Sequence, residues 1–177
     1  AALRGRDAPA SGVCVRTEYT MASEEAGDTI SMKKALRRKS QSLPKIESRG
    51  QSGLVSVIVP TYNRGYCVNK SIESALAQTY RDIEVIVIDD GSTDNTREVI
   101  TGAFGDDPRV KYVYQPNGGV SVARNHGIRL ARGEFMALLD SDDIWKPWKT
   151  ELQVRVLQER SEIGMVWTDM EAVNQDG

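Results

Sequence analysis

The chain has few of the residues that build disulfide frameworks or clustered metal sites, with two cysteines and one histidine in 177 residues. Cys14 and Cys67 lie in different regions and match no metal-ligand or redox spacing, so we expect two free thiols in a reducing compartment. No apolar run approaches the roughly 20 residues that span a bilayer. The N-terminus lacks the apolar core of a signal peptide. These absences favour a cytoplasmic protein.

Two common nucleotide-binding motifs are also missing. The first apolar run is followed by Pro60-Thr61-Tyr62-Asn63-Arg64 and not by the G-x-G-x-x-G of a Rossmann dehydrogenase. No G-x-x-x-x-G-K-S/T occurs anywhere, which excludes P-loop chemistry. A nucleotidyltransferase would need a glycine-rich basic loop after the first strand to hold a triphosphate. Residues 60–64 do not form such a loop.

The charge is unevenly distributed along the chain. Residues 1–51 carry a net charge of +4 and residues 52–177 a net charge of −6. An acidic body argues against nucleic acid as a partner. Residues 1–53 show no sustained period and are predicted to form a disordered, basic arm. Its cluster at residues 33–39 suits peripheral contact with an anionic surface at the inner face of a membrane, although a solvated arm is the favoured interpretation.

Alternating strand and helix patterns begin at Leu54. Strands are expected at residues 54–59, 83–88, 110–114, 134–139 and 164–168, with a sixth starting at 171–173 and a turn at 174–177. Helices are expected at residues 68–78, from a cap at Ser92 or Thr93 to Ile100, at 119–131 with Gly133 ending it, and at 148–159 with Pro147 in its first turn. Strand followed by helix, four times over, predicts an α/β fold: a parallel sheet with helices on both faces.

Two of the predicted strands run into carboxylate clusters. One strand ends in Asp89-Asp90-Gly91-Ser92, and another ends in Asp140-Ser141-Asp142-Asp143. Ligands of open α/β sheets bind at the carboxyl ends of the strands. An aspartate can accept a hydrogen bond from a base or ribose, and another can hold a hard divalent cation. A nucleotide-and-metal site is therefore the leading hypothesis.

Other residues near these strand ends have chemistry that suits a nucleotide. Tyr62 can stack on a base, although packing under a loop is an equal alternative. Gly118 and Gly119 precede a helix, where backbone amides can approach a phosphate. Arg124 can reach a diphosphate or form a surface ion pair. His126 has no second candidate ligand, so a structural role is favoured.

The order and spacing of four segments carry a resemblance to a known family. They are Val55-Ser56-Val57-Ile58-Val59-Pro60-Thr61-Tyr62-Asn63, Ile88-Asp89-Asp90-Gly91-Ser92-Thr93-Asp94, Asn117-Gly118-Gly119 with Ala123-Arg124-Asn125-His126-Gly127, and Leu138-Leu139-Asp140-Ser141-Asp142-Asp143. On these, residues 54–177 resemble the N-terminal, nucleotide-sugar-binding half of a family 2 glycosyltransferase with the GT-A fold. The arm at residues 1–53 lies outside the resemblance.

The resemblance implies roles residue by residue. The base pocket would be lined by Pro60, Thr61 and Tyr62, and Asp90 would hold the uracil ring with Asp89 beside it. Arg124 would touch the base or the diphosphate. Asp140 would lie near the ribose and the metal, and Asp142 would be the main ligand of Mg²⁺ or Mn²⁺. Such enzymes transfer a sugar from a nucleotide-sugar donor to the hydroxyl of a saccharide or lipid-linked acceptor, with inversion. UDP is the favoured nucleotide on resemblance alone.

The family pattern is matched only in part. The general base of such enzymes lies in the acceptor-binding half, so the catalytic base is expected beyond the chain end and the sheet is expected to be truncated on its C-terminal side. A non-catalytic nucleotide-sugar-binding or interaction module is therefore the alternative interpretation.

Overall fold

The computed structural model describes residues 50–171. The basic arm up to residue 49, with Cys14, and the predicted turn at residues 174–177 lie outside this part of the chain. In order, the elements are β1 Gln51–Thr61, α1 Val68–Leu76, β2 Ile83–Asp89, α2 Thr96–Phe104, β3 Val110–Tyr114, α3 Val120–Leu130, β4 Gly133–Leu138 and α4 Lys149–Glu159. The alternation predicted from the sequence is confirmed over these eight elements.

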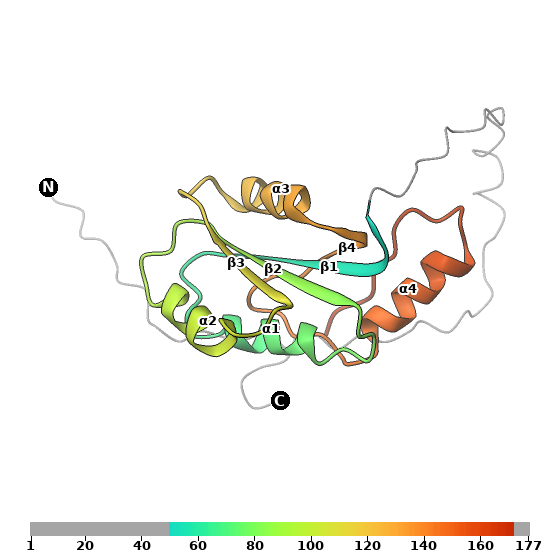
Figure 1. Cartoon of the computed structure of the whole chain (residues 1–177), viewed down its shortest axis with the longest axis horizontal. Coiled ribbons are helices and arrows are strands. Elements are labelled where there is room, and N and C mark those ends of the chain that lie inside the picture. Colours follow the sequence, from blue (N-terminus) through green and yellow to red (C-terminus); the bar gives the residue numbers. More distant parts are fainter. Residues whose placement is uncertain (1–49, 172–177) are drawn as a thin grey trace, which may run out of the picture.

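The four strands form one parallel sheet in the order β3-β2-β1-β4 (Figure 1). The two inner strands are runs of valine and isoleucine that are almost wholly buried, as expected where helices cover both faces of a parallel sheet. Because all four strands run the same way, their carboxyl ends meet at one edge. The predicted carboxylate clusters therefore come to the same side of the molecule.

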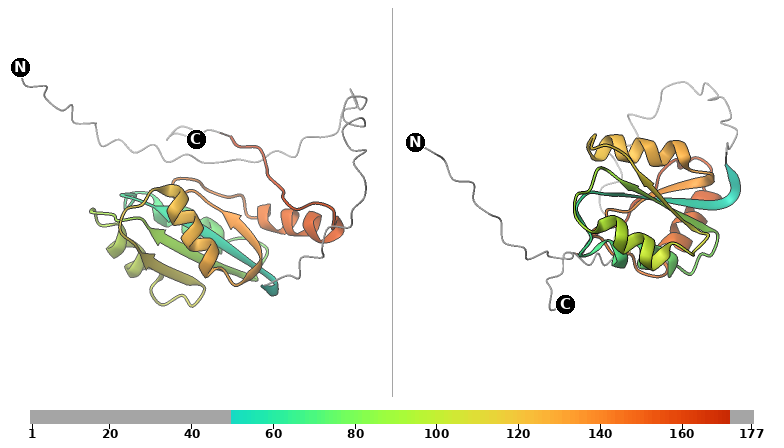
Figure 2. Two further views of the ribbon diagram at one scale, coloured as in Figure 1. Left: turned by 90° about the horizontal axis from the view of Figure 1, so that it is seen from above. Right: turned by 60° about the vertical axis from the view of Figure 1, so that its left-hand side comes forward.

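Helices pack on both faces of the sheet (Figure 2). On one face, α3 lies over β1 and β2, where Ala123 packs with Ile86 and Ile88. On the other face, the larger core takes side chains from three helices and from the sheet between them. Its helical members include Ile72 of α1, Ile100 of α2 and Val154 of α4. The expected α/β architecture with helices on both faces is thus confirmed.

The first strand begins earlier than expected, at Gln51 rather than at Leu54. The backbone N–H of Gln51 donates to the carbonyl of Arg132 at 2.7 Å, and that of Gly53 donates to the Glu134 carboxylate at 2.8 Å. The extra residues are therefore held by the start of β4, a partner distant in the sequence. Gly133, expected to end α3, instead begins β4, and a side chain there would meet the Leu54 carbonyl oxygen at 2.5 Å.

The expected helix cap at Ser92 or Thr93 is wrong, because α2 begins at Thr96. Ser92 instead accepts a hydrogen bond from the backbone N–H of Asn63 at 2.9 Å. Asp94 accepts from the N–H of Thr96 at 3.0 Å. Burial raises the pKa of the Asp94 carboxyl, but the hydrogen bonds from Thr96 and Gly65 outweigh burial and hold the pKa below its ordinary value.

The strand predicted at residues 164–168 is not formed, and Glu171, expected to start another, is also outside any strand. The segment has strand-like composition, yet Met165 and Trp167 are exposed and unpaired with the sheet. Strand propensity reflects packing against neighbours more than an intrinsic backbone preference. Without a neighbouring strand, these residues run as an irregular chain.

Within residues 50–171, no helix combines the length and apolar character that crossing a membrane requires.

Candidate functional site

A cavity of about 510 Å³ opens at the carboxyl ends of β1, β2 and β4. It is lined by Pro60, Thr61, Tyr62, Arg64, Asp90, Asn117, Gly119, Val120, Ala123, Arg124, Asp140, Ser141 and Asp142. All residues predicted for the site except Asp89 are in this lining. The cavity lies where the strand order reverses. From β1 the chain passes through α1 to β2 on one side, and after α3 it returns to form β4 on the other side of β1. Such switch points are the usual ligand sites of open α/β sheets.

Two polar atoms of residues lining the cavity are buried without a hydrogen-bond partner among the described residues. They are the hydroxyl oxygen of Thr61 and the Nε of Arg124. A buried polar group without a partner is costly and rare in native proteins. Both atoms can donate a hydrogen bond, so the cavity suits a ligand rich in acceptors, such as a diphosphate.

The side-chain carboxylate of Asp90 accepts three hydrogen bonds. Its Oδ1 accepts from the Gln115 side chain at 2.6 Å and from the N–H of Gly118 at 2.9 Å, and its Oδ2 accepts from the N–H of Gly119 at 2.7 Å. The expectation that these two glycine amides face a phosphate is therefore wrong, because a carboxylate of the chain already takes them. Asp90 is the anion at the N-terminus of α3, where the helix dipole favours negative charge.

Gln115 and His126 extend this arrangement. The Nδ1 of His126 lies 2.7 Å from the Oε1 of Gln115, whose amide nitrogen donates to Asp90. An amide oxygen can only accept, so Nδ1 of His126 carries the proton. The structural role expected for His126 is thus to orient Gln115, and through it Asp90. Gln115 was not predicted from the sequence, since its part depends on contacts with two distant residues.

Asp89 does not line the cavity. It is buried, its Oδ1 accepts from the N–H of Ser92 at 2.8 Å, and its Oδ2 accepts from the Tyr112 hydroxyl at 2.6 Å. Burial, and then the bond to Asp89, raise the pKa of Tyr112. The first carboxylate of the pair therefore fixes the β2–α2 turn and β3, and the second faces the cavity.

The loop between β1 and α1 is fixed to the turn before α2. Asn63 has a positive φ of 52°, and its side-chain oxygen accepts from the N–H of Thr93 at 2.8 Å. The N–H of Arg64 donates to the Thr96 hydroxyl at 3.0 Å. Tyr62, which precedes Asn63 in this loop, lines the cavity with about half of its surface exposed.

Two carboxylates of the cluster after β4, those of Asp140 and Asp142, each face an arginine. Arg124 on α3 donates to Oδ1 of Asp140 at 2.6 Å, and a guanidinium nitrogen of Arg64 lies 3.7 Å from Oδ2 of Asp142. Arg64 was not among the predicted site residues. Its place two residues after the predicted Tyr62 was the one feature of the sequence that could have indicated it.

The donor set of the β4 cluster suits Mg²⁺ or Mn²⁺. Asp140 and Asp142 bring two carboxylates to the cavity wall, and no group of three or more acidic, histidine or cysteine side chains is arranged around a metal position within residues 50–171. Mg²⁺ typically takes one or two carboxylates and completes its shell with water and substrate phosphates. Two carboxylates beside a cavity with unpaired donors fit that pattern.

A parallel α/β domain with a polar cavity at its switch point is typical of nucleotide-binding proteins. The family model described as Glycosyl transferase family 2 matches residues 56–174, which is more than half of the chain. The chain belongs to glycosyl transferase family 2. This confirms the resemblance drawn from the four sequence segments.

Individual relatives agree with this family. The chain is 40% identical over 124 residues to a chondroitin synthase of Pasteurella multocida, a match that covers 70% of this chain and 13% of the synthase. Among solved structures, S. aureus TarS 1–349 in complex with UDP-GlcNAc is 31% identical with a TM-score of 0.57, over 61% of this chain and 32% of that one. The mannosyltransferase PcManGT of Pyrobaculum calidifontis, in complex with GDP-Man and Mn²⁺, is 28% identical with a TM-score of 0.51, over 67% and 35% of the two chains. The chain thus spans a minor part of each.

Proposed function

We propose that this chain is the donor-binding part of a glycosyltransferase that transfers a sugar from a nucleotide-sugar to an acceptor hydroxyl, with inversion and with Mg²⁺ or Mn²⁺ as cofactor. The observation that carries the proposal is that one cavity is lined together by Tyr62, Asp90, Arg124, Asp140 and Asp142. Its unpaired donors at Thr61 and Arg124 favour a ligand rich in acceptors.

The base would bind between the ends of β1 and β2. Pro60 and Thr61 line the cavity beside the half-exposed ring of Tyr62. A carboxylate has about four lone-pair positions, and three of those on Asp90 are taken by the bonds described above. The remaining position on Oδ2 is suited to accept the N3–H of a uracil. TarS is described in complex with UDP-GlcNAc, and PcManGT in complex with GDP-Man. The higher identity to TarS favours UDP over GDP as the nucleotide of this chain.

The diphosphate would lie between α3 and the β4 cluster. Arg124 offers its unpaired Nε–H to a phosphate oxygen, and Asp142 with Asp140 would hold the divalent cation. When bound, that cation neutralises charge developing on the departing diphosphate. Holding the donor in one orientation lets an acceptor oxygen approach the anomeric carbon from the side opposite the departing diphosphate. Attack from that side inverts the configuration of the anomeric carbon.

The acceptor would be a saccharide or a lipid-linked acceptor. The acidic body of the chain makes nucleic acid an unsuitable partner. A cytoplasmic location, including the inner face of a membrane, is where a soluble nucleotide-sugar would meet such an acceptor.

Calorimetric titration of the full chain with UDP, in Mn²⁺ and then in EDTA, tests the proposal. Asp142→Ala should abolish the metal-dependent part of UDP binding and leave the thermal unfolding curve almost unchanged, since the side chain is partly exposed. Asp106→Ala, an exposed aspartate outside the cavity, is the control and should bind as wild type does. Metal-independent binding by wild type, or unchanged metal dependence in the Asp142 variant, would refute the ligand assignment.

A further inference from the structure

Two arginines oppose the two carboxylates to which the proposed function assigns the cation. Arg124 contacts Asp140 at 2.6 Å, and Arg64 lies 3.7 Å from Asp142. The four charges therefore balance without any metal. A divalent cation entering this cluster would meet two guanidinium groups as well as two carboxylates, and like charges at such distances repel.

The two arginines differ in how firmly they are held. Arg124 projects from α3, makes a short charge-assisted hydrogen bond and has a buried Nε. Arg64 makes a longer ion pair, and its side chain is 40% exposed. Its guanidinium carbon also lies 5.9 Å from the ring centre of Tyr66, which offers a second resting place. Of the two, Arg64 is the one whose side chain can leave its carboxylate at low cost.

The backbone beneath Arg64 is nonetheless fixed. Its N–H donates to Thr96, and its carbonyl accepts from the N–H groups of Cys67 and Val68 at the start of α1, each at 3.0 Å. A long side chain on a fixed backbone reaches a limited set of positions. Both Asp142 and the cavity interior are within that set, since Arg64 itself lines the cavity.

We propose that Arg64 is an exchange residue, which holds Asp142 in the metal-free chain and moves to the diphosphate when cation and nucleotide bind together. This rests on the proposed function. Arg64 opposes a cation that arrives alone, because it competes for Asp142. It favours the cation and nucleotide as a pair, because the diphosphate gives its guanidinium a new bidentate partner. Arg64 is thus a positioning residue that couples the binding of two ligands.

The coupling has a thermodynamic signature. The factor by which Mn²⁺ strengthens UDP binding must equal the factor by which UDP strengthens Mn²⁺ binding. If Arg64 couples the two ligands, part of this common factor comes from its charge. Removing the Arg64 charge should lower that common factor. A residue that only supports the fold would weaken both ligands without changing the factor.

Arg64→Met tests the exchange, because methionine keeps an apolar stem and removes the charge. In calorimetric titrations of the full chain, Mn²⁺ alone should bind about threefold more tightly, the value expected for losing an exposed ion pair. UDP in saturating Mn²⁺ should bind about tenfold more weakly, the value expected for losing one charge-assisted hydrogen bond. Arg64→Lys should restore much of the opposition to Mn²⁺ alone, since it keeps the charge.

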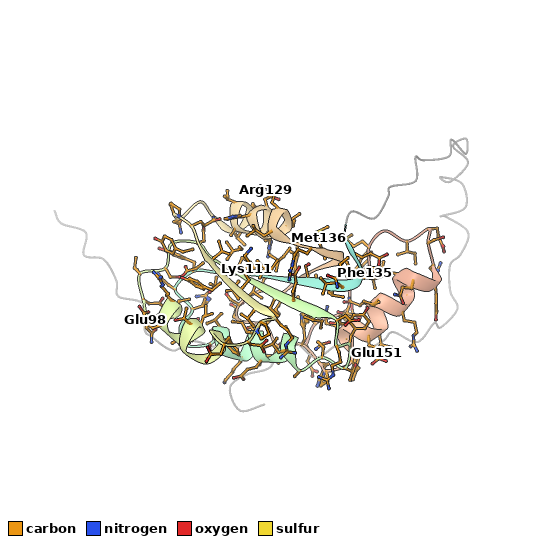
Figure 3. The ribbon with its side chains drawn as sticks, viewed as in Figure 1. Glu98, Lys111, Arg129, Phe135, Met136 and Glu151 are labelled. Atoms are coloured by element: carbon orange, nitrogen blue, oxygen red, sulfur yellow. The ribbon has the colours of Figure 1, made fainter. Side chains whose placement is uncertain are left out.

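Arg129→Met is the matched control, since Arg129 is exposed on α3 and outside the cavity lining (Figure 3). Opposite shifts for Mn²⁺ alone and for UDP with Mn²⁺ in the Arg64 variant, and neither in the control, would support the proposal. Equal shifts in one direction, or no shift, would overturn the exchange while wild type still bound UDP. A wild-type chain that bound no UDP in either condition would refute the proposed function itself.

Discussion

Lys149 is a buried cation at the first position of α4. It is only 7% exposed, its Nζ donates to the Gln153 side chain at 2.7 Å, and it lies 3.9 Å from the centre of the Trp145 ring. The ring and the amide offset only part of the lost hydration. Burial lowers the pKa of Lys149 to about 8. The protonated side chain therefore disfavours folding at neutral pH.

The sign of this effect can be measured. The unfolded chain holds the Lys149 proton up to its ordinary pKa of about 10.4, whereas the folded chain releases it near 8, so the stability should rise with pH between these values. We expect a gain of about 2 kcal/mol between about pH 7 and pH 9.5. The pKa values of Tyr66, Tyr80 and Tyr112 are raised, so their ionisation opposes folding only above about pH 10. Urea unfolding at the two pH values measures the gain.

Lys149→Met is the variant that isolates this group. It should flatten the pH dependence, because no buried amine remains to titrate. Lys70→Met, at an exposed position of α1, should keep the wild-type slope. A slope that survives in the Lys149 variant would assign the pH dependence to other groups.

The site residues that could be predicted are charged residues at the ends of expected strands. Asp90, Asp140 and Asp142 follow apolar runs of the sequence, and the parallel pattern alone brings them to one edge. Gln115 and Arg64 escaped prediction because they act through partners on other elements. Outside the site, the structural role of Glu84 was equally hidden, because it is an acid inside a strand pattern. In the structure its carboxylate accepts from the Ser56 hydroxyl at 2.6 Å.

At the scale of elements, α3 forms one wall of the cavity through Val120, Ala123 and Arg124. It lies close to β1 because Gly127 faces Ile58, where a side chain on the glycine would come within 2.4 Å of an Ile58 methyl group. The same helix carries Arg124 less than one turn before Gly127. The packing of α3 on the sheet therefore fixes the distance between the Arg124 guanidinium and the β4 cluster.

Two glycine substitutions in helices should have opposite effects. Gly127→Ala should destabilise the chain by about 1–3 kcal/mol through overpacking against Ile58, and it should weaken UDP binding by displacing Arg124. Gly102→Ala in α2 meets no atom within 4 Å and should stabilise the chain by about 0.5–1 kcal/mol. Chemical denaturation and calorimetry measure both. A neutral Gly127 variant would show that α3 can move without cost.

Element types were predictable where a pattern and its partners lie within one βα unit. The buried faces of α1 and β2 follow directly from their apolar spacing. The start of α2 was misplaced because Ser92 bonds across to the β1–α1 loop. The strand at residues 164–168 was wrongly predicted because its composition alone supplies no partner strand. The local sequence pattern therefore predicts the type of an element and its buried face, but not the contacts that an element makes with distant parts of the chain.

At the scale of the whole molecule, the two outer edges of the sheet differ. The β3 edge presents the exposed Lys111, whereas Met136 of β4 is 57% exposed (Figure 3). Leu138 of β4 and Met165, Trp167 and Met170 of the segment after α4 are also exposed. A lysine on an edge strand discourages pairing with another chain, and exposed apolar residues favour it.

We expect concentration-dependent self-association through the β4 edge. Met136→Lys should weaken it, because a buried charge would then have to enter the contact between copies. Ile128→Lys places the same charge at an exposed position of α3, away from the β4 edge, and should leave association at the wild-type level. Sedimentation velocity over a range of concentrations measures the difference. Equal association in the two variants would place the contact elsewhere.

The central place of β1 has a consequence for how the chain folds during synthesis. Val55 pairs with Ile83 on one side and with Phe135 on the other, so its second partner leaves the ribosome much later than its first. Long-range pairings of this kind form slowly. The side of the cavity between β1 and β2 can therefore take shape while the nascent chain is still being extended, and the side that carries Asp140 and Asp142 is completed last.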